Sequence, residues 1–394
     1  MYMERIGIYG GTFNPPHIGH IRAAEQAAEF LKLDKLLMIP DRIAPHKTLT
    51  GSAPDGAQRL QMLCLATANC ERLEPSDLEL RREGVSYTWE TVALLREQYP
   101  EAELVLLMGS DMFLSFHTWK NPEKIIENAA LGVFCRGDKG EQTAMDAQTA
   151  ALQALGARVE QIPITPVPIS STQLRRMLAF RCAEDFLPAG VGSYIRSEGL
   201  YDGNAPWKNL PMEELEQVVV SLLKPDRVKH VLGCRDTAVA LAKKWGADLT
   251  DAGRAGILHD ITKALDGPLQ LTLCAAYGKI LDDFSRKYPK TLHALTGSMV
   301  AREIFGENDT VVSAIEHHTT GKADMNLLET IIYVADYMEP GRDFDGVERL
   351  RELAFSDIQA ALKLGLEMTL EHLHRQGNEV SPQSREALEY LTIK

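Results

Sequence analysis

The sequence predicts two domains, an α/β domain with a parallel sheet followed by an all-α domain. Short β-rich runs alternate with longer amphipathic runs as far as residue 200, which is typical of a parallel sheet with crossover helices. Apolar residues then recur at helical spacing to residue 391. Because 394 residues exceed the size at which one hydrophobic core keeps growing, two domains are expected.

The elements of the first domain follow from the length and spacing of its apolar runs. Residues 21–33 carry the helical pattern, and the polar stretch 137–150 is expected to be a surface loop and the start of a helix. The short β-rich runs predict strands at residues 6–9, 35–39, 103–108 and 131–135.

A turn-rich segment that begins at Asp202 marks the domain boundary. We assign residues 1–201 to the first domain, 202–210 to a linker and 211–394 to the second domain. Helical spacing in the second domain predicts helices at residues 212–223, 225–245, 250–264, 269–277, 293–305, 309–317, 327–338 and 358–376.

Charge and cysteine usage narrow the class of protein. A net charge of -13 argues against non-specific binding to nucleic acid or to an anionic membrane. The six cysteines show no Cys-x-x-Cys spacing, which suits reduced thiols better than a disulfide framework. No basic segment followed by an apolar stretch opens the chain, and no run is long enough to span a bilayer, so a cytoplasmic protein is expected.

The first candidate site follows the first strand. The turn at Gly10 and Gly11 lets the backbone approach a ligand and aims free amides and a positive helix end at an anion. His17 and His20 lie within one turn of that helix end, with Gly19 between them. Paired imidazoles there can neutralise charge that grows on a phosphoryl group during transfer.

A second candidate segment lies at residues 169–175. Ser170 or Ser171 would cap a helix whose free amides, together with Arg175, would hold the distal phosphates of a nucleotide. An ordinary capped helix is the alternative. The presence of the His17 and His20 pair in the same domain favours phosphate binding.

These residues resemble the His-x-Gly-His and Ser-Thr-x-x-Arg signatures of bacterial nicotinate mononucleotide adenylyltransferases, which have the Rossmann-like fold of the nucleotidyltransferase superfamily. Further segments resemble the family in the same order, at residues 40–47, 59–62, 86–88, 109–111, 119–120 and 191–201. The resemblance implies that nicotinate mononucleotide attacks the α-phosphate of ATP in line, with Mg²⁺ on the phosphates, and that deamido-NAD and pyrophosphate are released.

The resemblance also implies residue roles. His17 and His20 would stabilise the transition state, and Lys47 would contact phosphate. Thr88 and Trp119 would recognise and stack the pyridine ring, with a strand position and a core position as their respective alternatives. The residues that would bind ATP are Gly10, Gly11, Thr12, Phe13, Asp111, Ser171, Thr172 and Arg175. For Asp111 a helix cap is an alternative that is compatible with ligand contact.

The second candidate site is a set of histidines and aspartates among apolar helical runs: His230, His259, Asp260, His293, His317, His318 and Asp336. Lone histidines on such faces are usually core residues. An unpaired buried carboxylate, however, costs several kcal/mol, so these carboxylates need a positive partner. A divalent metal meets this need, and nitrogen and oxygen ligands leave zinc, manganese, iron, nickel and cobalt open.

The order of these residues resembles the HD phosphohydrolase superfamily. The similarity is closest at residues 317–321 and 335–342, which resemble bacterial HD-domain hydrolases that split diadenosine tetraphosphate symmetrically into two ADP. The resemblance implies an iron-preferring centre in which His230, His259, Asp260 and Asp336 bind the metal, with Asp260 also catalytic. His293, His317, His318 and Arg342 would then hold a second metal or the substrate phosphates.

Other charged and imidazole side chains of this half have weaker assignments. Lys263 and Arg342 could neutralise polyphosphate charge, although a solvated surface position is the alternative. His372 and His374 are expected to face solvent. Two alternatives to diadenosine tetraphosphate hydrolysis remain for the second domain: it is a non-catalytic nucleotide sensor that regulates the first domain, or it hydrolyses another nucleotide phosphoester. A third gives the first domain a different acceptor.

Overall fold

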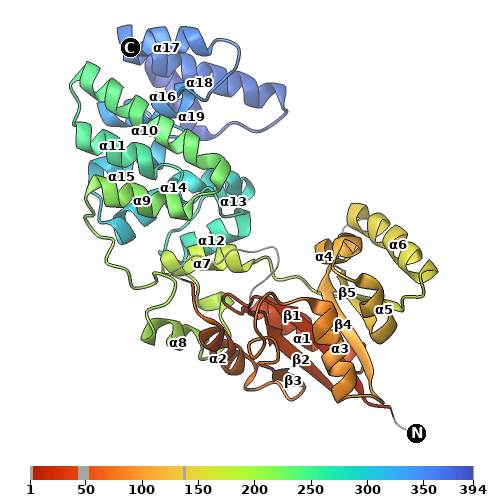
Figure 1. Cartoon of the computed structure of the whole chain (residues 1–394). Helices are drawn as coiled ribbons and strands as arrows, with labels where there is room; N and C mark the ends of the chain where they lie inside the picture. Colours follow the sequence, from red (N-terminus) through yellow and green to blue (C-terminus); the bar gives the residue numbers. More distant parts are fainter. Residues whose placement is uncertain (1–2, 43–52, 136–138, 394) are drawn as a thin grey trace. The chain divides into compact units, whose positions relative to one another are not determined.

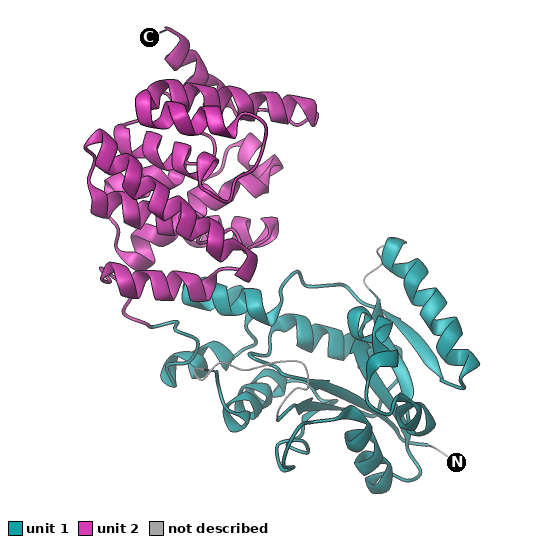
Figure 2. Cartoon of the chain, turned by 45° about the horizontal axis from the view of Figure 1, so that its top comes forward, with its two compact units in different colours: residues 1–204 teal, residues 205–394 magenta. Residues whose placement is uncertain are grey.

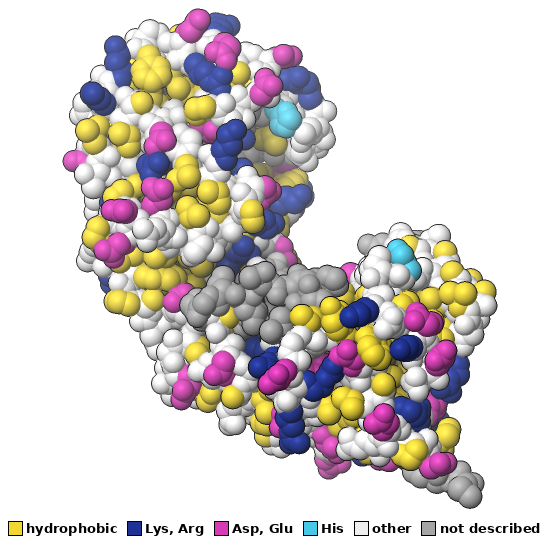
Figure 3. All heavy atoms as spheres, viewed as in Figure 1, with side chains coloured by type: hydrophobic (Ala, Val, Ile, Leu, Met, Phe, Trp, Pro, Cys, Tyr) yellow, Lys and Arg dark blue, Asp and Glu magenta, His cyan; other side chains and the backbone are white. Residues whose placement is uncertain are grey.

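The computed structural model describes residues 3–42, 53–135 and 139–393. The chain divides into two compact units, Met1–Asn204 and Ala205–Lys394, which Figure 2 colours separately. Within the described ranges all six cysteines are thiols. No helix in these ranges has the length and apolar character needed to cross a membrane. Basic and acidic side chains are intermixed over the face drawn in Figure 3.

The first unit is built on a six-stranded parallel sheet with the order β3-β2-β1-β4-β5-β6 (Figure 1). β1 therefore pairs with both β2 and β4, and the direction of winding reverses between β1 and β4. Open α/β sheets bind ligands outside the carboxyl ends of the strands at such a switch point. The strands are β1 (Arg5–Gly11), β2 (Lys35–Pro40), β3 (Leu73–Pro75), β4 (Glu103–Gly109), β5 (Ala130–Cys135) and β6 (Val159–Pro163).

The central strands consist of continuous apolar runs because helices cover both faces of the sheet. Ile6 and Leu104 are fully buried, for example. The stretch 137–150, predicted to be a surface loop and the start of a helix, is helical throughout its described part, from Lys139 onward. The helices are α1 (Ile18–Phe30), α2 (Gly56–Thr67), α3 (Thr88–Gln98), α4 (Ser110–Leu114), α5 (Pro122–Asn128), α6 (Lys139–Ala154), α7 (Ser171–Ala179) and α8 (Val191–Ser197).

The second unit is all-α, as the spacing of its apolar residues predicts. Residues 205–393 are all described and form helices and turns without a strand. Its helices are α9 (Met212–Leu222), α10 (Pro225–Trp245), α11 (Leu249–Leu258), α12 (Gly267–Ala276), α13 (Asp283–Lys287), α14 (Leu292–Val300), α15 (Asp309–His317), α16 (Leu327–Met338), α17 (Val347–Ser356), α18 (Ile358–Arg375) and α19 (Pro382–Ile393). A single π-helical turn, Ala301–Phe305, continues α14.

The predicted helix over residues 250–264 is wrong in its second half. α11 ends at Leu258, and residues 259–264 form successive turns. Adjacent residues of a helix point about 100° apart, so a continuous helix would separate the side chains of His259 and Asp260. The turns are held by side chains, since Thr262 Oγ1 donates to the His293 oxygen at 2.9 Å and Gln270 Nε2 donates to the Thr262 oxygen at 2.8 Å.

The segment predicted as a linker packs on the second unit from residue 205 onward. Trp207 is 9% exposed, and its ring stacks on Phe305 with centroids 5.8 Å apart and planes at 4°. The Asn209 amide donates to the Phe305 oxygen at 2.8 Å, and the Arg254 guanidinium donates to the Leu210 oxygen at 2.7 Å. Trp207 thus joins the hydrophobic core of the second unit, and main-chain hydrogen bonds hold the rest of the segment against it.

Candidate phosphate-binding site and candidate metal centre

The two histidines of the first candidate site lie against each other after β1. The His17 and His20 ring centroids are 3.6 Å apart, and the His17 amide donates to His20 Nδ1 at 3.2 Å. Burial lowers the pKa of His17 to about 4, so the ring is neutral near pH 7. A Cβ on Gly19 would lie 2.9 Å from His17 Nδ1, so glycine at this position leaves the space that the imidazole fills.

The second segment lies in contact with the loop that follows β1. Ser170 is the residue that caps α7, since its Oγ accepts from the Gln173 amide at 3.2 Å. Ser171 Oγ donates to the Pro15 oxygen at 3.2 Å. The Arg175 guanidinium donates to the Asn14 oxygen at 2.7 Å and to Thr172 Oγ1 at 3.1 Å. The two signatures, far apart in sequence, therefore form one surface.

A buried network that sequence reasoning missed supports the same loop. Arg59 of α2 is 1% exposed, and its guanidinium donates to the main-chain oxygens of Thr12 at 2.8 Å and Asp41 at 2.6 Å. Thr12 Oγ1 donates to the Asp41 carboxylate at 2.8 Å. The sequence feature that could have indicated this network is the position of Arg59 on the largely apolar, buried face of α2. The side chain and the main-chain oxygen of Thr12 thus both hold the loop in place.

The remaining predicted residues of this site are distributed around the sheet. Asp111 is exposed in the first turn of α4, directly after β4 at the switch point. Thr88 begins α3 and so is not a strand residue, and it is half-buried. Trp119 is also half-buried and lies 5.3 Å from the Phe116 ring. Lys47 lies outside the described residues.

Four side chains of the second unit converge on one point. His230 Nε2 lies 3.2 Å from His259 Nε2, 3.2 Å from Asp336 Oδ1 and 3.6 Å from Asp260 Oδ2. His259 and Asp260 are 0% and 2% exposed. Metal–ligand bonds of ~2.0–2.2 Å place neighbouring ligand atoms roughly 3–3.6 Å apart, so these atoms fit a single divalent ion.

The other carboxylate oxygen of Asp260 faces a second group of donors. Asp260 Oδ1 lies 3.4 Å from His293 Nε2 and 3.8 Å from His318 Nε2. His318 Nε2 is buried and has no hydrogen-bond partner among the described residues. Lys263 Nζ lies 2.8 Å from His293 Nε2. Asp260 thus separates two donor sets, and the second can take either a cation or an anionic group held by Lys263.

Hydrogen bonds set the tautomer of three of these histidines. A carbonyl oxygen only accepts, so an Nδ1 atom bound to it carries the proton and leaves the Nε2 lone pair for a metal. Each of the three uses the carbonyl three residues earlier: His259 to Gly256 at 2.8 Å, His293 to Lys290 at 2.9 Å and His318 to Ile315 at 2.7 Å.

The charge states of the cluster suit a cation. Burial lowers the pKa of His259 to about 4 and that of His293 to about 3, so both rings are neutral near pH 7. Burial alone would raise the pKa of Asp260, but the His259 imidazole and the Lys263 ammonium outweigh it and hold that pKa well below its usual range. The centre therefore presents neutral imidazoles and ionised carboxylates, which is the ligand state a divalent metal needs.

Three basic side chains, each about one-third exposed, lie at the edge of the cluster. Arg342 Nη2 contacts Asp336 Oδ1 at 2.6 Å, and Lys263 Nζ lies 3.8 Å from Asp260 Oδ1. Arg227, which sequence reasoning missed, lies 3.2 Å from Asp260 Oδ2. Its signal was its position three residues before His230, which places the two side chains on one helix face.

The structure does not bring His317 into the cluster. Its Nδ1 donates to the Ser313 oxygen at 2.8 Å, and its side chain lines a separate cavity of about 280 Å³ with Glu316 and Thr320. His372 and His374 are exposed on α18, as expected.

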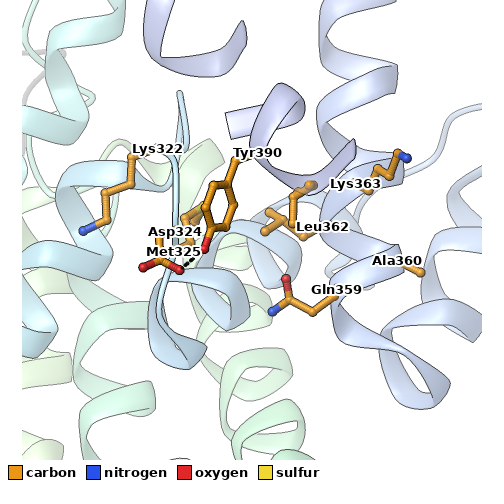
Figure 4. Close-up of a pocket in the computed structure, with 9 residues that line it drawn as sticks. Lys322, Asp324, Met325, Gln359, Ala360, Leu362, Lys363 and Tyr390 are labelled. Atoms are coloured by element: carbon orange, nitrogen blue, oxygen red, sulfur yellow. Dashed lines mark hydrogen bonds between the residues drawn. The ribbon is translucent and has the colours of Figure 1, made fainter. Parts of the chain in front are cut away.

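A larger cavity of about 500 Å³ lies beside α18 and α19 (Figure 4). Its lining includes Lys322, Lys363 and Tyr390, whose hydroxyl donates to Asp324 at 2.6 Å. None of the residues predicted for either site is among those that line it. The candidate functional site of the second unit is therefore the cluster of histidines and aspartates around Asp260, and not this cavity.

Comparison with known proteins agrees with this division. Residues 8–177 match the family model described as Cytidylyltransferase-like, and residues 227–341 match that of the HD domain. A protein of Neisseria meningitidis serogroup C named "Probable nicotinate-nucleotide adenylyltransferase" is 37% identical over 204 residues, which cover 51% of this chain and all of that relative. A protein of the same name from a Shewanella species is 37% identical over 211 residues, covering 50% of this chain and 99% of its own length.

A solved structure is similar to about half of this chain. It is described as a predicted HD superfamily hydrolase involved in NAD metabolism from Clostridium acetobutylicum, with 37% identity, a TM-score of 0.46 and coverage of 47% of this chain and 98% of that chain. The whole length of the Neisseria relative is aligned, and the paired histidines and the α7 segment lie together at the switch point of the sheet. On these grounds the chain belongs to the nicotinate-nucleotide adenylyltransferase family, to whose catalytic fold it adds an HD domain.

Proposed function

We propose that the chain is a bifunctional enzyme whose HD domain hydrolyses diadenosine tetraphosphate symmetrically to two ADP in a metal-dependent reaction. The first unit is a nicotinate mononucleotide adenylyltransferase of NAD biosynthesis. The observation that carries the proposal for the second unit is the convergence of His230, His259, Asp260 and Asp336 on one point, with basic side chains at its edge.

In the first unit, a phosphate oxygen of nicotinate mononucleotide forms a bond to the α-phosphorus of ATP as the bond to pyrophosphate breaks. Developing negative charge is stabilised by preorganised donors near the reacting phosphate. We assign this role to His17 and His20, and the distal phosphates of ATP to Ser171, Thr172 and Arg175. Support comes from the contacts of Ser171 and Arg175 with the loop that leads to His17.

The other substrate contacts of the first unit are assigned by the same family pattern. Gly10, Gly11, Thr12 and Phe13 would approach the nucleotide through their main chain, and Asp111 would meet it from the end of β4. Thr88 and Trp119 would bind the pyridine ring, and Lys47 would contact phosphate. Mg²⁺ would accompany ATP.

In the second unit, water adds to a phosphorus of the central anhydride and the bond between the two inner phosphates breaks, so each product is ADP. A divalent ion at the cluster would supply Lewis acidity and lower the pKa of the attacking water. His230, His259, Asp260 and Asp336 would hold it, and iron is our expectation for its identity. Neutral imidazoles with ionised carboxylates support this assignment.

The basic side chains would bind the tetraphosphate. Arg227, Lys263 and Arg342 bring positive charge to one edge of a site that contains two carboxylates. A tetraphosphate chain carries several negative charges, and guanidinium groups bind phosphate bidentately. His293 and His318 would hold either a second ion or one of these phosphates, since both face Asp260 Oδ1.

Product analysis of the full chain tests both activities. One reaction holds ATP, Mg²⁺ and nicotinate mononucleotide, and we expect deamido-NAD and pyrophosphate. The other holds diadenosine tetraphosphate with ferrous iron, and we expect ADP as the sole nucleotide product. ATP with AMP would instead show asymmetric cleavage. Metal and nucleotide binding without turnover would contradict the proposal and indicate a sensor.

A further inference from the structure

His230 differs from the other histidines of the cluster in how its ring is held. His259, His293 and His318 lie at or near helix ends, and the Nδ1 atom of each donates to the main-chain oxygen three residues earlier. His230 lies inside the 21-residue helix α10, where the carbonyls one turn earlier are engaged in the helix. Its Nδ1 instead bonds to a side chain from another part of the chain.

Glu339 supplies that acceptor. Its carboxylate Oε1 lies 3.2 Å from His230 Nδ1, and the residue is 2% exposed although it lies 109 positions away in sequence. Because a carboxylate accepts, His230 Nδ1 carries the proton, and the Nε2 lone pair faces His259 and Asp336. No sequence pattern points to a role for Glu339.

The surroundings of Glu339 are shaped to hold its carboxylate at this place. The Gly341 amide donates to Oε2 at 2.6 Å. A Cβ on Gly233, one turn after His230 on α10, would lie 2.6 Å from the same oxygen, and a Cβ on Gly341 would lie 2.9 Å from Oε1. Glycines on two elements thus leave the space that the carboxylate fills.

The turn that carries Glu339 is itself fixed. Arg351 of α17 donates to the main-chain oxygens of Met338, Glu339 and Arg342 at 2.9–3.0 Å. The same turn carries Arg342, which donates to Asp336. The turn therefore contacts two of the converging side chains, His230 through Glu339 and Asp336 through Arg342. Such a rigid turn places a charge reproducibly, as an orienting partner requires.

We propose that Glu339 is a positioning residue for the metal centre, which orients His230 through Nδ1 and adds negative charge behind that ligand. The inference rests on the proposed function, because it assumes that the cluster binds a divalent ion. Partners of this kind fix the ring and strengthen the imidazole as a ligand, and their loss weakens metal affinity by roughly 10–100-fold.

Calorimetric titration of Mn²⁺ into the metal-stripped full chain tests the proposal without relying on turnover. We expect Glu339→Ala to weaken Mn²⁺ binding by about 10–100-fold. Glu339→Gln keeps an acceptor but loses the charge, so its loss should be smaller. Gly233→Ala leaves Glu339 in place but crowds its carboxylate, and should also weaken binding. Asp343 is an exposed neighbour in the same turn. Asp343→Asn removes one negative charge, as Glu339→Gln does, and should bind Mn²⁺ as tightly as the parent.

The outcomes separate this inference from the proposed function. Mn²⁺ affinity equal to the parent's in Glu339→Ala would overturn the role of Glu339 while leaving the metal centre intact. A parent chain that binds no Mn²⁺ at this centre would overturn the metal centre and the inference with it. Thermal unfolding of the metal-stripped proteins distinguishes a folding defect, because a positioning role predicts similar midpoints for Glu339→Gln and the parent.

Discussion

Arg175 and Asn14 lie 161 residues apart in sequence, yet the Arg175 guanidinium donates a 2.7 Å hydrogen bond to the Asn14 main-chain oxygen. Asn14 is part of the loop that leads from β1 to His17, and Arg175 lies on α7. The bond therefore holds the two segments of the candidate nucleotide site together. Arg175 thus has a structural role, and under the proposed function its charge would also bind a phosphate of ATP.

Replacement of Arg175 by lysine tests this joint role. A lysine is a point charge that cannot contact the Asn14 oxygen and Thr172 together, so both loop position and phosphate contact should suffer. We expect the KM for ATP in adenylyl transfer to rise about tenfold, which corresponds to about 1.4 kcal/mol. Arg158→Lys serves as the control, because the Arg158 side chain is exposed and lies directly before β6, away from the candidate site. Equal KM values for the two variants would contradict the assignment.

Gly19→Ala tests the space reserved for His17. The added Cβ would lie 2.9 Å from His17 Nδ1 and 3.0 Å from Cε1, so the imidazole must move. Since displacement of a positioned group by about 1 Å can cost about 100-fold in rate, we expect adenylyl transfer to slow by about 10–100-fold. Gly203→Ala, where the nearest atom is 3.6 Å away, should leave transfer unchanged. Undiminished transfer by Gly19→Ala would show that the ring position is unimportant.

The pH dependence of stability should report the burial of His17. Burial lowers the pKa of His17 from 6.5 to about 4, so folding favours the neutral ring. The free energy of unfolding is therefore highest above pH 6.5. It decreases as the pH falls from 6.5 toward 4, because the unfolded chain then binds a proton that the folded chain does not. Between pH 7 and pH 4.5 the parent should lose about 2–3 kcal/mol more unfolding free energy than His17→Gln. Parallel denaturant midpoints for the two proteins across this range would contradict a buried neutral ring.

Trp207→Ala should destabilise the second unit. Trp207 is 9% exposed and stacks on Phe305, and truncation of a buried tryptophan costs about 3–5 kcal/mol. Thermal unfolding of the full chain should show a lower transition for the helical unit, whereas Lys208→Ala at an exposed neighbour should not. If residues 205–210 were only a tether, the two variants would unfold alike.

Much of the fold was predictable because buried elements have strong local patterns. The strands at Ile6, Leu36, Leu104 and Leu131 consist of continuous apolar runs, as parallel strands buried on both faces do. β3 spans only Leu73–Pro75, and β6 is largely half-buried, so neither carries such a run. The short α13 and the charged α17 were missed because their packing, rather than their local pattern, stabilises them.

The candidate sites were predictable where chemistry is local in sequence. His17 and His20 share one helical turn, and His259 and Asp260 are adjacent. The partners Arg59 and Glu339 were missed because each acts on residues brought near only by folding. Adjacency also associated His317 with His318, although neighbours on a helix point about 100° apart. The structure directs His317 to Ser313 instead.

Substitutions of adjacent residues should distinguish the side chains of the candidate metal centre from those that are close to it only in sequence. Asp260 faces both donor sets, so Asp260→Ala should abolish metal loading and hydrolysis together. His318→Ala removes a buried donor 3.8 Å from Asp260 and should lower hydrolysis by at least tenfold. His317→Ala removes a side chain outside the cluster and should retain most activity. The readouts are metal content, ADP release from diadenosine tetraphosphate and, as a folding control, adenylyl transfer by the same preparation. Hydrolysis retained by Asp260→Ala, or lost equally in His317→Ala and His318→Ala, would place the chemistry elsewhere, because of these three residues only Asp260 and His318 lie in the cluster.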